Sequence, residues 1–321
     1  MKRRVLLSAI LVLAPPFAGA QPEKVHTIGY MSLQSRASEA GRLAMFRRGM
    51  KDLGYVEGKN LIIEIRHAEG NLKRLAEFPA EFVRRKVDVI VAVGGDSIQV
   101  AQRATRTIPI IFPLTGDPTV FVKNLARPEG NVTGFTSRGT DLSRKRLEIL
   151  REALPGLLRV AVVWNPANPT SALSMRELDV AAGALGLRVQ RVEVSKPEDF
   201  EHAFSRMGQH RPQALYFVPD EMFHTRRARI AELAIKSRFP TMFYAGEWVE
   251  DGGLMAYASH VPDLFRGAAV YVDRILKGAK PGDLPVQQAS KFELVVNLKT
   301  AQAIGIAIPR SILLRADRVI E

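Results

Sequence analysis

The stretch VAVGGDS, residues 91–97, ends one apolar run with residue types that could bind a ligand or take part in catalysis. Two glycines, an acid and a hydroxyl stand where a buried strand is expected to turn into a helix. Gly94 and Gly95 let the backbone turn sharply and approach a ligand. Asp96 or Ser97 can cap the helix or face that ligand. Such a turn could hold a phosphate, take part in catalysis or border another kind of pocket.

Nucleotide binding and catalysis find little support around this turn. Its glycines lack the Gly-x-Gly-x-x-Gly order that brings a pyrophosphate to a helix N-terminus, and no Gly-Lys-Ser/Thr follows. The six histidines are scattered, there is no cysteine, and no metal-binding spacing such as His-Glu-x-x-His occurs. We therefore expect no catalytic residue, no metal and no cofactor.

Short polar residues also follow the other expected strands, on the side where parallel sheets bind ligands. The candidate ligand-binding residues are Ser32, Leu33, Gly95, Asp96, Ser97, Thr115, Asp117, Asn165, Asp220 and Glu247. Carboxylates bind an ammonium group, and helix N-termini bind an anionic group. This set predicts a small solute that carries both, such as an amino acid or a related amine. Each acid could equally be only a helix cap, Asp117 and Asp220 in particular.

The elements that would position these residues alternate along the chain. Apolar runs and amphipathic stretches follow one another from His26 to about Gly253, which predicts parallel sheets with helices on both faces. The pattern runs once to about Gly134 and again from Leu142. At 321 residues the chain is long enough for two lobes. We expect two similar, doubly wound α/β lobes that face each other across a cleft.

Two local signals predict where helices begin. Asp117 stands directly before Pro118, so its side chain can cap a helix whose first turn contains the proline. Ser195 and Glu198 have the spacing of a capping box, in which each side chain bonds the other's backbone amide.

The N-terminus has the order of a secretory signal peptide. The basic residues Lys2–Arg4 precede an apolar run over residues 5–14, and Ala18–Ala20 has the form of a cleavage site. The apolar run is shorter than the roughly 20 residues that span a bilayer. We expect cleavage after Ala20 and, because no cysteine is present to accept a lipid, a free periplasmic protein.

The formal net charge of +13 raises the question of nucleic acid. The cations are spread over the faces of expected amphipathic helices, with no interleaved aromatic residues. They are typical of solvated helix surfaces, so we expect no nucleic-acid partner.

Five blocks of sequence are specific enough to carry a resemblance over almost the whole chain. They are residues 125–134, 145–150, 252–257, 268–281 and 284–301. On these blocks the chain resembles the ABC-transporter substrate-binding proteins of the tryptophan/tyrosine-type group, which have the two-lobed, type I periplasmic-binding-protein fold. The resemblance implies a monomer that partners an ABC permease in the inner membrane. The chain departs from the commoner family pattern at VAVGGDS, where Thr-Pro or Ser-Pro is usual.

The expected organisation has four parts. Residues 1–20 form the signal peptide, 24–135 with about 258–290 the first lobe, 136–257 the second lobe, and 291–321 a hinge strand with tail helices. Thr136 and Tyr257 are the expected hinge residues, because the chain must pass between the lobes near them.

We expect an exported solute-binding protein of an ABC importer, which captures a small polar solute between its lobes by hinge closure. One alternative is a sensor that presents its closed form to a membrane receptor. A third, less favoured interpretation is a secreted enzyme. Such an enzyme would need a titratable partner within hydrogen-bond reach of Asp96 or Asp117.

Overall fold

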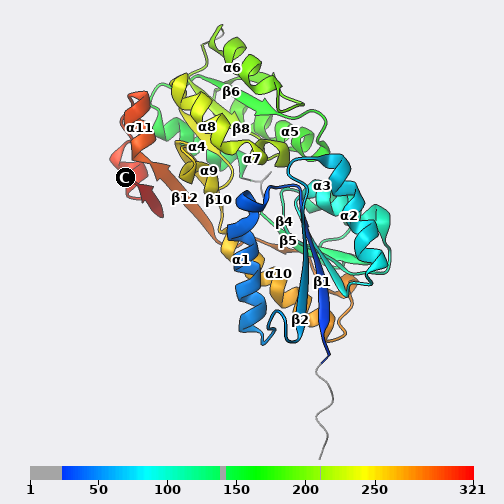
Figure 1. Ribbon diagram of the computed structural model, residues 1–321. Helices are drawn as coiled ribbons and strands as arrows, with labels where there is room; N and C mark the ends of the chain where they lie inside the picture. Colours follow the sequence, from blue (N-terminus) through cyan, green and yellow to red (C-terminus); the bar gives the residue numbers. More distant parts are fainter. Residues whose placement is uncertain (1–23, 138–141, 210) are drawn as a thin grey trace, which may run out of the picture.

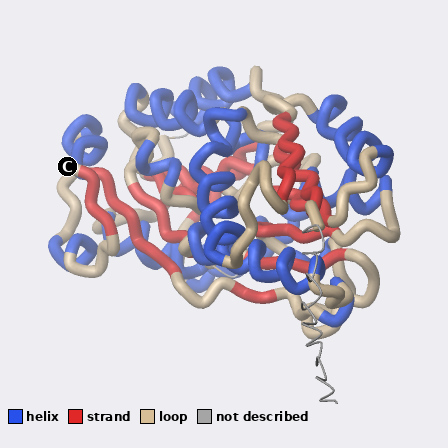
Figure 2. Tube along the Cα trace, turned by 60° about the horizontal axis from the view of Figure 1, so that its bottom comes forward, coloured by secondary structure: helices blue, strands red, loops and turns tan. Residues whose placement is uncertain are grey.

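The computed structural model describes residues 24–137, 142–209 and 211–321, which form two α/β lobes (Figure 1). The expected signal peptide and its cleavage site lie outside these residues. Within the described ranges, no helix combines the length and the apolar composition needed to cross a membrane. Each lobe is built around one sheet, and helices flank the strands in both views (Figure 2).

The first lobe has a six-stranded parallel sheet in the order β11-β5-β4-β3-β1-β2. Its strands are β1 (His26–Ser32), β2 (Leu61–His67), β3 (Val89–Val93), β4 (Ile110–Thr115), β5 (Val132–Thr136) and β11 (Gln287–Gln288). Its helices are α1 (Arg36–Asp52), α2 (Leu72–Arg84), α3 (Gly95–Ala104), η1 (Pro118–Val120), α10 (Val261–Leu276) and η2 (Pro281–Asp283). One apolar cluster packs α1 and α10 on one face of the sheet, and a second packs α2 and α3 on the other. Because both faces are covered, every residue of β3 is buried and apolar.

The second lobe has a seven-stranded sheet in the order β13-β12-β10-β9-β8-β6-β7. Its strands are β6 (Arg159–Trp164), β7 (Arg188–Glu193), β8 (Ala214–Phe217), β9 (Thr241–Phe243), β10 (Met255–Ser259), β12 (Phe292–Asn297) and β13 (Arg318–Ile320). Its helices are α4 (Ser143–Ala153), α5 (Pro169–Ala184), α6 (Asp199–Gln209), α7 (Glu221–Thr225), α8 (Arg227–Lys236), α9 (Glu247–Glu250), α11 (Leu298–Ile304) and α12 (Arg310–Leu313). They also pack on two faces. The predicted fold class, two doubly wound α/β lobes, is confirmed.

The C-terminal segment, expected as a hinge strand with tail helices, contributes two strands to the sheet of the second lobe. Strand β12 pairs with β10 in the antiparallel direction, and β13 pairs with β12. Residues 294–296 of β12 are buried, which ties this strand into the second core. The alternation of strands and helices predicts parallel pairs only, so it could not show that the returning strand runs the other way.

The chain passes between the lobes three times, after β5, β10 and β11. Hydrogen bonds link the described ends of these connecting segments. The backbone amide of Ala289 donates to the carbonyl oxygen of Thr136 at 2.9 Å, and the Ser259 hydroxyl donates to the carbonyl oxygen of Ser137 at 3.0 Å. Thr136, one expected hinge residue, is the last residue of β5 and stands at the edge of the first lobe. Tyr257, the other, lies inside β10 of the second lobe, two residues before its end.

Candidate functional site

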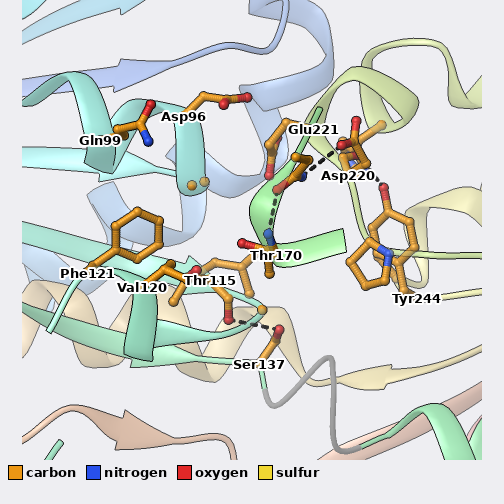
Figure 3. A pocket seen from close by; sticks show the side chains of 18 of the residues that line it. Asp96, Gln99, Thr115, Val120, Phe121, Ser137, Thr170, Asp220, Glu221 and Tyr244 are labelled. Atoms are coloured by element: carbon orange, nitrogen blue, oxygen red, sulfur yellow. Dashed lines mark hydrogen bonds between the residues drawn. The ribbon is translucent and has the colours of Figure 1, made fainter. Parts of the chain in front are cut away.

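A cavity of about 290 Å³ lies between the two lobes (Figure 3). Its walls come from the loops and helix starts that follow β3, β4, β6, β8 and β9. The volume is near the lower end of the range for small-molecule sites, about 300–1,000 Å³. The cavity therefore fits one small solute.

The first lobe contributes the start of α3 and the loop around η1. Gly94 precedes α3 in the left-handed region, with φ of 83°, and no side chain caps this helix. Asp96 and Gln99 of α3 border the cavity, as does Phe121 just after η1. Thr115, the last residue of β4, lines it from below α3 in Figure 3.

The second lobe contributes a set of loops held together by Asp220. One carboxylate oxygen of Asp220 accepts hydrogen bonds from the side-chain amides of Asn165 at 3.1 Å and Asn168 at 2.8 Å. The other accepts from the backbone amide of Met222 at 2.9 Å and so caps α7. The Tyr244 hydroxyl donates to the Asp220 carbonyl oxygen at 2.7 Å. Asp220 therefore ties three loops of this wall into one unit.

Asp96 is the cavity-lining acid with no such partners. Among the described residues, nothing donates a hydrogen bond to its half-buried carboxylate. Burial raises the pKa of Asp96 to about 6, and the negative charge of Asp220 across the cavity adds to the rise. Burial also raises the pKa of Glu221 to about 7. Figure 3 shows Asp96 and Glu221 at the same end of the cavity. Gln34 donates a hydrogen bond to Glu221, so the carboxylate of Asp96 is the group at this end that can attract a cation.

Apolar and hydroxyl groups complete the cavity. Phe121 and Tyr244 lie on opposite sides of it, one from each lobe (Figure 3). Thr115, Ser137 and Thr170 bring hydroxyl groups to its walls. Within the described ranges, no group of three or more histidine or acidic side chains is arranged to hold a metal ion. The site can therefore hold a solute with a cationic group, a polar group and an apolar or aromatic part.

An ion pair beside the cavity joins the two lobes. Arg42 of α1 is 4% exposed, and its Nε lies 3.1 Å from Oε1 of Glu247. Its Nη2 lies 3.1 Å from Nε2 of His224. Burial acts to raise the pKa of Glu247, but the charge and hydrogen bond of Arg42 outweigh it and the pKa is lowered. Burial, with the charges of Arg42 and Arg227, lowers the pKa of His224 well below its usual value.

The family model of the ABC transporter substrate binding proteins matches residues 36–320 of the chain. The chain belongs to this family. The resemblance that its five sequence blocks carry is thereby confirmed.

Several relatives match this substrate-binding protein over most of their length. A tyrosine-binding protein of Clostridioides difficile (strain R20291) is 26% identical over 284 residues, which cover 88% of this chain and 81% of the relative. The crystal structure of an ABC domain in complex with L-Trp from Streptococcus pneumonia has 25% identity and a TM-score of 0.86. A conserved domain protein from Vibrio cholerae O1 biovar eltor has 28% identity and the same TM-score. Both structures cover 92% of this chain and are covered completely. Type I periplasmic binding proteins at 11–17% identity share the fold alone.

Four of the candidate residues line the cavity of this substrate-binding protein, and two more touch residues that line it. The four are Gly95, Asp96, Thr115 and Asp220. Asn165 donates to Asp220, and Glu247 pairs with Arg42. These six residues lie near one another because each stands at or after the carboxyl end of a parallel strand, which is where ligands bind in such sheets.

The other four candidates lie away from the cavity. Ser32 is fully buried and donates to Oε2 of Glu39 at 3.1 Å, and Leu33 belongs to the apolar core. Ser97 is fully buried, and its hydroxyl has no hydrogen-bond partner among the described residues. Asp117 accepts a hydrogen bond from the Thr119 amide at 2.8 Å, so it caps η1 as its helix-cap interpretation predicts.

Sequence reasoning missed Arg42, Glu221 and His224 of this substrate-binding protein, which all line the cavity. A signal for Arg42 does exist. Glu39 and Arg42 share the buried side of α1 with Phe46, at helical spacing, and a charged pair on an apolar stripe indicates a buried interaction. No comparable pattern marks Glu221 or His224.

Proposed function

We propose that this substrate-binding protein captures an aromatic α-amino acid, or a related aromatic amine, in the cavity between its lobes. Asp96 receives the ammonium group. The uncapped start of α3 and the hydroxyl group of Thr115 receive the polar or anionic end. Phe121 and Tyr244 flank the aromatic part from opposite sides. The observation that carries the proposal is the half-buried carboxylate of Asp96, which no described residue pairs.

The relatives support the same solute class. One is a tyrosine-binding protein, and another is an ABC domain in complex with L-Trp. At 25–26% identity they narrow the choice of solutes to test rather than fix it.

Membership of the family supports a role in solute delivery. We infer that the chain is exported to the periplasm with Gln21 as its first residue, which the mass of the secreted protein tests. As a monomer, it hands its solute to an ABC permease in the inner membrane. The solute bridges both lobes and stabilises the closed arrangement by the contacts that it makes only there.

Isothermal titration calorimetry with a matched panel tests the solute class. L-tryptophan, L-tyrosine and L-phenylalanine are compared with their N-acetyl forms and with tryptamine and tyramine. We expect binding of amine-bearing compounds and no binding of the N-acetyl forms, which lack the cation. Binding of the amines without the amino acids would mean that the site rejects the carboxylate group, and would contradict the contact assigned to the anionic end. Equal binding of an amino acid and its N-acetyl form would contradict the proposal.

Solute affinity is expected to rise about tenfold between pH 5 and pH 7. Asp96 has a pKa of about 6 and must be ionised to pair with the ammonium group, so protons compete with the solute below that value. Glu221, with a pKa of about 7, ionises over the same range and adds to the rise. Calorimetry at pH 5, 6, 7 and 8 measures the slope, and Asp96→Asn should flatten it. An affinity that falls as the pH rises would exclude the carboxylate contact.

A further inference from the structure

Gly94 leaves room on the first lobe for a side chain of the second. A Cβ at this position would lie 2.6 Å from Oε1 of Glu221, too close for two atoms that are not bonded. Its φ of 83° also favours glycine. The missing side chain at Gly94 therefore lets the carboxylate of Glu221, the first residue of α7, lie against the backbone of the first lobe.

Gln34 binds the same carboxylate from another direction. Its Nε2 donates to Oε2 of Glu221 at 2.6 Å and to the Glu221 carbonyl oxygen at 3.3 Å. Gln34 is fully buried, and its backbone amide donates to the Ser32 hydroxyl, which donates to Glu39. Contacts within the first lobe thus orient Gln34 for a partner on the second lobe.

Arg42 supplies positive charge to the same place. It pairs with Glu247 and contacts His224, both on the second lobe. Burial raises the pKa of Glu221, and the charge of Arg42 opposes that rise. Two acidic side chains of the second lobe therefore converge on one buried cation of the first.

We propose that Gly94, Gln34 and Arg42 are positioning residues that form a seat for Glu221 of the second lobe. The inference rests on the proposed function, because it assumes that the lobes open and close around a solute. All the contacts of the seat are made by protein groups, so they favour the closed arrangement even without solute. The seat also fixes where Glu221 stands in the cavity wall, and hence how the solute meets it.

Distances between two spin labels, measured without solute, test the seat. The chain has no cysteine, so the full-length protein with Lys73→Cys and Lys236→Cys takes one label on each lobe. Both lysines are exposed, Lys73 on α2 and Lys236 on α8. We expect the solute-free protein to show a population at the short distance that solute makes dominant.

Gly94→Ala is expected to reduce that population about tenfold, as overpacking does. Gly58→Ala is the matched control, because Gly58 has the same φ of 83° and open space around its Cβ position. Adding Glu221→Ala to Gly94→Ala removes the clashing side chain and should restore part of the population. Gln34→Ala should lower it, and the exposed Gln302→Ala should not.

The outcomes separate this inference from the proposed function. If the short distance is absent without solute and appears with it, the proposal that these residues form a seat for Glu221 is wrong, and the proposed function stands. If Gly94→Ala and Gly58→Ala behave alike, the clash with Glu221 plays no part and the seat is again wrong. If no member of the solute panel changes the distances or binds, the proposed function fails.

Discussion

Asp96→Asn is expected to weaken solute binding by about 10- to 100-fold. A hydrogen bond to a charged group contributes about 1.5–3 kcal/mol, and each 1.4 kcal/mol is tenfold in affinity. The amide that replaces the carboxylate keeps its size and loses its charge. Calorimetry with the best solute of the panel measures the change at pH 7.

The same substitution should stabilise the solute-free protein. The pKa of Asp96 is raised from 3.8 to about 6 by burial and by Asp220, so the folded protein binds this proton more tightly than the unfolded chain. The free energy of unfolding of the protein with Asp96 therefore falls as the pH rises from about 4 to about 6. The Asp96→Asn variant has no ionisable group at this position, so it does not lose this stability. Thermal unfolding of both proteins without solute at pH 7 checks the sign.

Asp117→Asn is the control, since asparagine can keep the cap on η1 and the side chain lies outside the cavity. It should leave both affinity and stability nearly unchanged. Weakening of solute binding by Asp117→Asn to the same extent as by Asp96→Asn would mean that the ammonium contact has been assigned to the wrong acid.

Arg42→Ala is expected to lower the free energy of unfolding by about 3 kcal/mol or more. The substitution leaves Glu247 without its cation and removes the positive charge beside Glu39, which is fully buried. Breaking a buried pair by removing one partner costs more than the pair itself contributes, because the remaining charge stays in a poorly solvated place. Denaturant unfolding measures the change.

Arg47→Ala on the same helix provides the comparison. Arg47 is 44% exposed and pairs with Glu57 at the surface, so its loss should cost less than about 1 kcal/mol. Glu247→Gln added to Arg42→Ala should recover part of the lost stability, because it removes the unpaired charge. Equal effects of the two arginine substitutions would show that the interlobe pair does not stabilise the protein.

The local sequence pattern predicted strands, strand-end residues and a helix cap correctly where the feature depends on a single chain segment. Apolar runs located the strands, and the strand-end rule placed Asp96, Thr115 and Asp220 around one cavity. Asp117 caps η1 as expected. The capping box at Ser195 was wrong: α6 begins at Asp199, whose own carboxylate accepts the Lys196 amide. The acid that accepts a backbone amide here is one residue further along the chain than the capping-box spacing predicts, and spacing alone does not say which of two adjacent acids will do so.

Contacts between the lobes could not be predicted from local sequence patterns. Gln34 and Glu221 are 187 positions apart, and Arg42 and Glu247 are 205 apart. Nothing in either segment shows what the other lobe presents to it. Gly94 is the instructive case. Its sequence context explains a sharp turn, and only the structure shows the second lobe's side chain that fills the space left free.

The three crossings between the lobes have a mechanical consequence. The hydrogen bonds from Ala289 to Thr136 and from Ser259 to Ser137 link the segments that connect the lobes. If the lobes close by a hinge as proposed, we expect connecting segments linked in this way to favour rotation about a single axis. The outer rims of the two lobes would then move along one path as the proposed closure takes place. Under the proposed function, we therefore expect a membrane partner that contacts both rims to distinguish the filled from the empty cavity without touching the solute.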